Sequence, residues 1–282
     1  MDGSLKFSTL KEKQRAIRAG FPETMGLRVH RAISWVGRSE ACDGDDDARF
    51  LFLWIAFNAA YADEREFQSI APGERAAFLD FFGKLVALDK EKKVYKALWQ
   101  RFTGPVRLLM DNRFVFSPFW QHHNGIDGYE DWEARFNASV RSFPQAFQAG
   151  DPARVLSFVF DRLYVLRNQL IHGGATWNSG VNRAQVRDGA TILAFLLPVF
   201  VDLMMDNPEQ DWGKPFYPVV DWEFEVANIV AASAPISTSR PNCDKKLSNH
   251  HSRICLKVPR RHTNLVFQAG RRSTTHQTER PA

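Results

Sequence analysis

The sequence predicts an all-α protein, and three observations support this class. Apolar residues recur mainly at three- and four-residue spacing, the period of an α-helix that is buried on one side. We find no sustained alternation of apolar and polar residues bounded by Asn-Gly or Asp-Gly turns, so paired strands are not expected. The hydrophobic content of 44% and the aromatic content of 13% suffice for a large core, which excludes disorder of the whole chain.

Two helices are predicted near the N-terminal end. The first covers residues 25–39. The acidic stretch 43–47 ends it and supplies N-cap carboxylates to the second, over residues 48–63. The second helix should be buried on nearly all sides, because it carries an apolar run of Phe50, Leu51, Phe52, Leu53, Trp54, Ile55 and Phe57.

An amphipathic helical pair is predicted after the Ala71-Pro72-Gly73 break. Its helices cover residues 74–88 and 91–102. Glycines and prolines interrupt residues 103–128, which favours an inserted loop with one short helix over residues 106–111.

The clearest helix begins at Asp151-Pro152. An N-cap carboxylate followed by proline is a strong start signal, and Gly173-Gly174 is a strong stop signal about 21 residues later. Before it, residues 129–148 show helical periodicity, and Pro144 is expected to bend or end that helix.

A last long helix is predicted over residues 181–206, with a bend at Pro198. Its apolar stretch 190–201 has about twelve residues, short of the roughly 20 that span a membrane, so we expect a buried core helix and no membrane partner. Residues 212–220, rich in proline and aromatics, are expected to pack back as an extended cover.

The net charge of +5 is unevenly distributed. Residues 231–282 hold ten basic and two acidic groups, a net of +8, which leaves 27 basic and 30 acidic groups, a net of −3, in residues 1–230. The tail also has one aromatic residue, Phe267. We therefore predict one helical domain over residues 1–230, followed by a disordered basic tail over 231–282. The basic isoelectric point of the chain is therefore due to the charge of the tail and not to that of the helical domain.

A cytoplasmic location is expected. The first ten residues lack the basic start and apolar stretch of a secretory signal. The three cysteines, Cys42, Cys243 and Cys255, are odd in number and widely spaced, which argues against a disulfide framework.

The strongest functional motif lies at the end of the clearest helix. Arg167 and His172 are separated by four residues, and Asn168 follows the arginine directly. A second Arg/His pair with the same spacing, Arg271 and His276, lies in the tail, where no helix or core is predicted. The motif within the helix resembles the R-x4–6-H motif of the HEPN superfamily, and the looser resemblance covers about residues 25–220.

This resemblance implies a HEPN-like helical bundle with additional helices. Many members of that superfamily are metal-independent ribonucleases of toxin–antitoxin and phage-defence systems. For this chain it implies an endoribonuclease with Arg167, Asn168 and His172 as catalytic residues. It also implies RNA as substrate, no metal or other cofactor, an antitoxin protein as a further partner, and a homodimer formed through the motif-bearing helices.

The chemistry of these side chains suits RNA cleavage. At 100° per residue, Asn168 and His172 share one helix face, and Arg167 lies about 140° around from His172. A neutral His172 would take the proton of a 2′-hydroxyl, or a protonated His172 would give its proton to the 5′-oxygen, while Arg167 stabilises charge on phosphate, giving 2′,3′-cyclic phosphate and 5′-hydroxyl ends.

Because residues 1–230 carry a net negative charge, any RNA-binding groove in them must be a local basic patch. We expect Arg162, Arg183 and Arg187 to bind substrate together with Arg167. Two alternatives remain open. In one, Arg167 and His172 only bond the last carbonyls of their helix, with Arg167 paired to a carboxylate. In the other, the protein is a non-catalytic helical dimer that binds protein or nucleic acid.

Other candidate sites are weaker. Asp43, Asp45 and Asp47 are spaced like a calcium loop, but Ala48 and Trp54 occupy its glycine and glutamate positions, so a helix cap is favoured. His122-His123 is favoured as a surface turn over a metal pair. The tail has zinc-ligand residue types without finger spacing, and no nucleotide-binding or serine-hydrolase motif occurs. Three aromatic residues have rings that can stack on bases, although cover of the core is commoner: Trp177, Trp212 and Tyr217.

Overall fold

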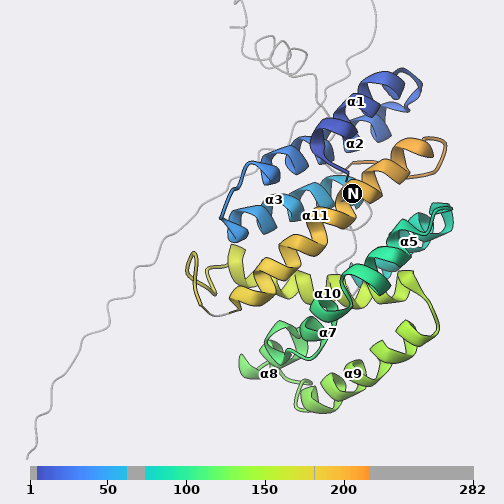
Figure 1. Ribbon diagram of the computed structural model, residues 1–282. Coiled ribbons are helices and arrows are strands. Elements are labelled where there is room, and N and C mark those ends of the chain that lie inside the picture. Colours follow the sequence, from blue (N-terminus) through green and yellow to red (C-terminus); the bar gives the residue numbers. More distant parts are fainter. Residues whose placement is uncertain (1–4, 62–73, 181, 216, 218–282) are drawn as a thin grey trace, which may run out of the picture. The chain divides into compact units, whose positions relative to one another are not determined.

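The predicted all-α class is confirmed for the part of the chain that the structure describes. The computed structural model describes residues 5–61, 74–180, 182–215 and 217, and every regular element among them is helical (Figure 1). The predicted domain boundary at residue 230 and the basic tail lie outside these residues. The α-helices are α1 (Phe7–Ile17), α2 (Glu23–Glu40), α3 (Asp46–Tyr61), α5 (Glu74–Leu88), α6 (Lys93–Lys96), α7 (Thr103–Met110), α8 (Ser117–His123), α9 (Trp132–Gln148), α10 (Pro152–Ile171) and α11 (Arg183–Asp206).

Helix α10 is the central element, and it begins and ends where its capping residues predict. The Asp151 carboxylate accepts a hydrogen bond from the Arg154 N–H at 3.1 Å, and Pro152 occupies the first turn. Along its length α10 contacts α3, α5, α7, α9 and α11. Its C-terminal end, which carries the Arg/His motif, is thereby fixed relative to the rest of the helices.

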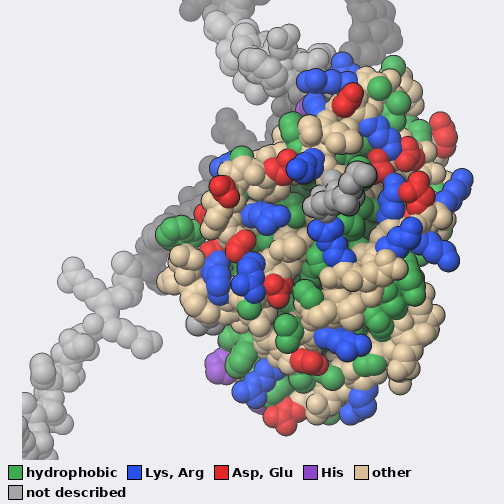
Figure 2. All heavy atoms as spheres, viewed as in Figure 1, with side chains coloured by type: hydrophobic (Ala, Val, Ile, Leu, Met, Phe, Trp, Pro, Cys, Tyr) green, Lys and Arg blue, Asp and Glu red, His purple; other side chains and the backbone are tan. Residues whose placement is uncertain are grey.

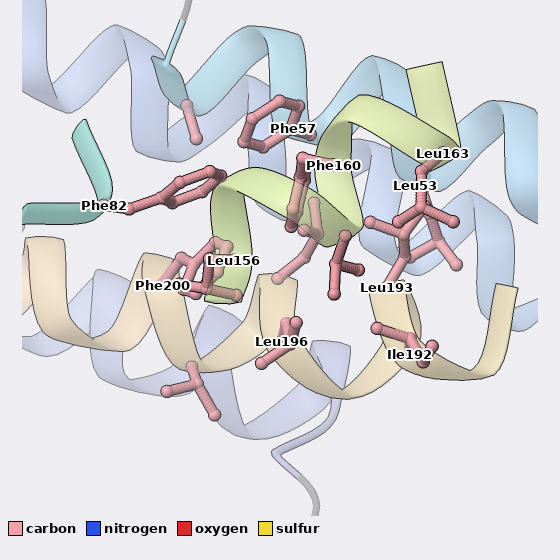
Figure 3. Packing of buried hydrophobic residues seen from close by; sticks show 14 of the residues in the cluster. Leu53, Phe57, Phe82, Leu156, Phe160, Leu163, Ile192, Leu193, Leu196 and Phe200 are labelled. Carbon is pink, nitrogen blue, oxygen red and sulfur yellow. The ribbon is translucent and has the colours of Figure 1, made fainter. Parts of the chain in front are cut away.

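An aromatic and aliphatic core lies where α3, α5, α10 and α11 meet (Figure 3). The ring of Phe160 on α10 has its centroid 4.4 Å from that of Phe57 on α3 and 4.8 Å from that of Phe82 on α5. Phe200 on α11 completes the cluster. All four side chains are fully buried, so burial of these large apolar surfaces is a main source of stability.

Helix α11 confirms the prediction of a buried core helix. Within the described residues it is long and apolar enough to cross a membrane, but 78% of that stretch is buried inside the protein. Pro198 lies within α11, and Pro144 lies within α9 without ending it, since α9 continues to Gln148.

One local prediction was wrong, and a second was right about helical structure but not about the type of helix. Residues 103–128 are not mainly a loop: they form α7, a short 3₁₀ turn (Arg113–Val115) and α8, because the prolines at 105 and 118 lie in first turns, where they favour helix. The helix expected over residues 91–102 consists of α6 and a π-helical turn (Ala97–Arg101), in which the Phe102 N–H bonds the Ala97 carbonyl.

Helix α1 was not predicted. Only Leu10 and Gln14 on it are buried, so the apolar periodicity is weak. The ring of Phe7 lies against Gly37 of α2, where a Cβ would come within 2.6 Å of a ring carbon. The absence of a side chain at Gly37 therefore lets α1 pack on α2.

The expected cover is present where the structure describes it. Trp212 is buried, and its ring lies against Phe81. The buried guanidinium of Arg28 on α2 donates hydrogen bonds to the carbonyls of Gly213 and Lys214. Residues 216 and 218–220 of the predicted cover lie outside the described residues.

Candidate active site at the end of helix α10

The Arg/His motif lies at the C-terminal end of α10. Arg167 and Asn168 belong to its last two turns, and His172 is the C-cap residue with φ −91° and ψ 12°. The backbone N–H of His172 donates to the carbonyl of Asn168 at 3.0 Å. The three predicted catalytic residues are therefore held on one continuous stretch of ordered backbone.

Arg167 is oriented by its neighbour rather than by a carboxylate. One terminal nitrogen, Nη1, donates to the Asn168 Oδ1 at 2.8 Å, and the guanidinium carbon lies 5.8 Å from the centre of the Tyr164 ring. The Nε atom is buried and has no hydrogen-bond partner. Among the described residues, Arg167 thus forms no ion pair, and it keeps donor capacity for an anion.

His172, at the end of the same helix, is exposed at the surface. No described residue makes a hydrogen bond with its imidazole ring. An accessible imidazole at a fixed backbone position meets the first geometric requirement of a general acid or base, which is access to the atom that gains or loses the proton.

Backbone groups cap the end of α10. The N–H of Gly174 donates to the Gln169 carbonyl at 2.7 Å, and the N–H of Gly173, at φ +71°, donates to the Leu170 carbonyl at 3.4 Å. This pair of bonds is a Schellman motif. The alternative in which the side chains of Arg167 and His172 bond the last carbonyls is therefore not what the structure contains.

The loop that follows the motif is tied to the start of α3. The Trp177 Nε1 donates to the Asp45 Oδ2 at 3.1 Å, and the Asn178 N–H donates to the Asp47 Oδ2 at 2.8 Å. Asp45 also accepts from the Ala48 N–H, which confirms the predicted helix cap. These bonds hold the indole of Trp177 in place although it is 73% exposed.

All three predicted substrate-binding arginines contact protein groups. Arg162 is only 3% exposed, donates to the Ser139 Oγ at 3.2 Å and lies 4.4 Å from the centre of the Phe116 ring. Arg183 pairs with the buried carboxylate of Asp47 at 2.7 Å. Arg187 pairs with the Asp188 carboxylate at 3.4 Å, and its side chain, 61% exposed, is the most accessible of the three.

No single basic patch marks the face that Figure 2 draws. Basic and acidic side chains are interspersed over it, in keeping with the net negative charge of residues 1–230.

Sequence reasoning missed a large open cleft beside the N-terminal half of α10. Its volume is about 1050 Å³, and α5, α8, α9 and α10 contribute to its walls. The signal was present in the sequence, since polar side chains recur at helical spacing on an otherwise apolar helix. The polar residues that α9 and α10 place on its walls are Arg135, Ser139, Ser142, Arg154, Ser157, Asp161, Arg162 and Tyr164.

The cleft and the motif adjoin one another. Tyr164 lines the cleft, and the Arg167 guanidinium lies against the Tyr164 ring. Tyr164 thus links the cleft to the motif-bearing end of α10.

Other predicted candidates lie elsewhere. His122 and His123 are exposed at the end of α8, where the ring of His123 stacks on Phe119 at 6.0 Å. Within the described residues no group of three or more His, Cys, Asp or Glu side chains is placed to hold a metal ion. The cysteines and histidines of the tail lie outside those residues.

No family model, curated protein or solved structure matches this chain.

Proposed function

We propose that this protein is a metal-independent endoribonuclease of the HEPN type, acting in a toxin–antitoxin or phage-defence system. One observation carries the proposal: Arg167 is partly buried and held by Asn168, forms no ion pair among the described residues, and lies five residues from an exposed histidine. A buried cation without a protein anion is costly, so such a site favours an anionic ligand.

The proposed reaction is a transesterification within the RNA strand. The 2′-oxygen attacks the neighbouring phosphorus, the bond from phosphorus to the 5′-oxygen breaks, and Arg167 stabilises the charge on the non-bridging oxygens. One imidazole accepts the proton of the 2′-hydroxyl, and a second protonates the leaving oxygen. The products are a 2′,3′-cyclic phosphate and a 5′-hydroxyl.

A two-fold dimer supplies the second imidazole in this proposal. Each chain has one His172, so two copies related by a two-fold axis bring two motifs to one phosphate. His172 and the neighbouring Ile171, which is also exposed, lie at the helix end where a second copy would meet them. Of the predicted substrate-binding arginines, Arg187 is the one exposed enough to approach the flanking phosphates.

Cleavage by purified variants tests the function. We expect the wild-type protein to cut single-stranded or structured RNA in EDTA, and His172→Ala and Arg167→Ala to lose at least about a hundredfold in rate. His123→Ala and Arg141→Ala are matched controls, since both residues are exposed and lie outside the motif. Equal rates for wild type and His172→Ala would refute the assignment.

A non-catalytic binding module is the second candidate. The exposed and fixed indole of Trp177, next to the motif, is the observation that favours it. This candidate predicts that the wild-type protein binds a protein or nucleic acid without cleaving RNA, and that Trp177→Ala, rather than His172→Ala, removes the activity.

A further inference from the structure

Helix α1 carries basic side chains that the proposed chemistry at the motif does not use. Residues 5–20 contain five basic residues and one acidic residue, although residues 1–230 as a whole have a net charge of −3. Lys11, Arg15 and the C-cap residue Arg18 follow the i, i+4, i+7 spacing, so they lie along one face of the helix. We call these three residues the α1 row.

No protein carboxylate neutralises the α1 row in the part of the chain that the structure describes. None of its three side chains forms an ion pair there, and the adjacent Glu12 pairs with none of them. By contrast, Lys13 on the opposite side of α1 pairs with Asp202 at 2.6 Å and with Asp206 at 2.7 Å. The α1 row is therefore separate from the ion pairs that hold α1 to α11.

The Lys11 amine lies among other basic groups. It donates to the Gln14 Oε1 at 2.9 Å and lies 3.4 Å from the Nδ1 of His30 on α2, so a fourth basic side chain borders the row. The pKa of Lys11 lies below its ordinary value of 10.5, first because of partial burial and then because Arg15 and Arg18 repel its charge. An anion bound between these side chains would offset that repulsion.

The spacing of the α1 row suits the phosphates of one nucleic-acid strand. Its last cation follows its first by seven residues, which corresponds to about 10.5 Å along the helix axis. A stacked strand carries one phosphate per about 3.4 Å, so the row spans about three nucleotides. Arg15 and Arg18 are exposed, and an arginine binds phosphate through two parallel hydrogen bonds. Three cations thus face about three successive phosphates.

Helix α11 sets the distance between the α1 row and the motif. Lys13 of α1 contacts Asp202 near the C-terminal end of α11, whereas Gln169 of the motif accepts a hydrogen bond from the N-cap residue Asn182 at 2.9 Å. Asp202 follows Asn182 by twenty residues, about 30 Å along the helix. A strand needs about nine nucleotides to span that distance, so only an RNA of this length or longer contacts both places.

We propose that the α1 row binds phosphates of an RNA strand about 30 Å from the motif, and so holds long substrates more tightly than short ones. The inference rests on the proposed nuclease function, which makes RNA the polyanion that reaches this surface. An anionic membrane suits the row less well, because helices that lie on membranes expose an apolar face. On α1, Leu10 is buried, and among its described residues Ile17 is the one large hydrophobic side chain that is exposed.

RNA binding by a non-cleaving variant tests the α1 row. The protein is the full chain with His172→Ala in EDTA, and the probe is a fluorescein-labelled strand of twenty adenosines. We expect Arg15→Glu and Arg18→Glu each to raise the dissociation constant at least about fivefold, because each replaces attraction to phosphate by repulsion. Each should also reduce the slope of log K against log salt by about 0.7, the effect of one lost phosphate contact. Fluorescence anisotropy measures both quantities.

Arg141→Glu is the matched control. Arg141 is an exposed arginine on α9 that forms no ion pair among the described residues, and its reversal should leave the dissociation constant within about twofold. Every variant keeps the basic residues 231–282, so any contribution of that segment to binding is the same in all of them. Circular dichroism melting confirms that each variant is folded. Equal binding by the row variants and Arg141→Glu, or no binding by any of them, would overturn the proposal.

The length of the RNA tests the distance between the α1 row and the motif. In the protein with His172 intact, Arg15→Glu should raise KM for a strand of twenty nucleotides at least about fivefold. For a strand of five nucleotides KM should stay within about twofold of wild type, since so short a strand does not span about 30 Å. The same increase in KM for both lengths would contradict the proposal.

Failure of the α1 row and failure of the nuclease assignment give different results. If strand binding depends on the row but wild type leaves RNA intact, the row stands and the nuclease assignment falls. If wild type cuts RNA and Arg15→Glu binds and cuts the long strand as Arg141→Glu does, the nuclease assignment stands and the row falls. If Arg15→Glu instead loses binding to phosphatidylserine vesicles while RNA binding is unchanged, the row is a membrane site and the proposal also falls.

Discussion

The hydrogen bond between Arg167 and Asn168 is the contact on which the proposed chemistry depends most. The Nη1 atom of Arg167 donates to the Oδ1 atom of the adjacent Asn168 at 2.8 Å. This bond orients a guanidinium that has no carboxylate partner among the described residues. The residue types at the motif were predictable because they are local in sequence. The contacts of Arg162 and Arg183 with other side chains were not predictable, because their partners Ser139 and Asp47 lie 23 and 136 residues away in the sequence.

Removal of the Asn168 amide should impair catalysis more than binding. In Asn168→Ala the guanidinium of Arg167 loses the acceptor that orients it, and misplacement by about 1 Å costs up to roughly a hundredfold in rate. We expect kcat to fall between tenfold and a hundredfold, with KM changed less than about threefold. Steady-state kinetics on labelled RNA measures both constants. Asn137→Ala, an exposed amide on α9, is the control, and a purely structural role would predict loss of folded protein with kcat unchanged.

At the scale of single elements, capping and apolar periodicity predicted helices well where the signals were strong. Helix α10 has an N-cap aspartate, a first-turn proline and a glycine stop, and its bounds match the prediction. Helix α1 has no side-chain cap and few buried residues, so it carried no comparable signal. Polar side chains at helical spacing were a sequence signal for the cleft, but its space depends on small side chains of α9 and α10 together, which the pattern of one helix does not predict.

The crossing of α3, α10 and α11 depends on a glycine. A Cβ on Gly189 of α11 would lie 2.9 Å from the Leu163 Cδ2 and 3.0 Å from the Phe50 Cε2. We expect Gly189→Ala to destabilise the protein by about 1–3 kcal/mol, because overpacking outweighs the better helix propensity of alanine.

Gly83 on α5 provides the control for this prediction. No atom lies within 4 Å of a Cβ placed there, so Gly83→Ala should stabilise by up to about 1 kcal/mol. Urea unfolding measures both changes. A Gly189→Ala protein as stable as Gly83→Ala would contradict the packing at this crossing.

At the scale of the whole molecule, one buried carboxylate connects distant parts of the chain. Asp202 on α11 is 2.6 Å from the Lys13 amine of α1 and 3.2 Å from the Lys93 amine of α6. Burial alone lowers the pKa of Lys93, but hydrogen bonding and attraction to Asp202 outweigh it, so this pKa lies above its ordinary value of 10.5. These contacts were not predictable from local sequence patterns.

Because folding raises the pKa of Lys93, part of the free energy of unfolding is lost at alkaline pH. The contribution of Lys93 is complete below the unfolded-state pKa of 10.5 and is lost as the pH rises through the higher folded-state value. Lys93→Met should therefore be less stable than wild type at about pH 8, and the difference should shrink above about pH 11. Urea unfolding across this range checks the direction. Lys96→Met, at an exposed position on the same helix, should show no such convergence.

The chemical groups at the new ends of cleaved RNA test the proposed nuclease function most directly. Labelled RNA is incubated in EDTA with wild type, with His172→Ala and with the exposed-histidine control His123→Ala, and the new 3′ and 5′ ends are identified. The account predicts 2′,3′-cyclic phosphate and 5′-hydroxyl ends from wild type and His123→Ala, and no such ends above background from His172→Ala. Products with 3′-hydroxyl and 5′-phosphate ends, or identical products from all three proteins, would contradict it.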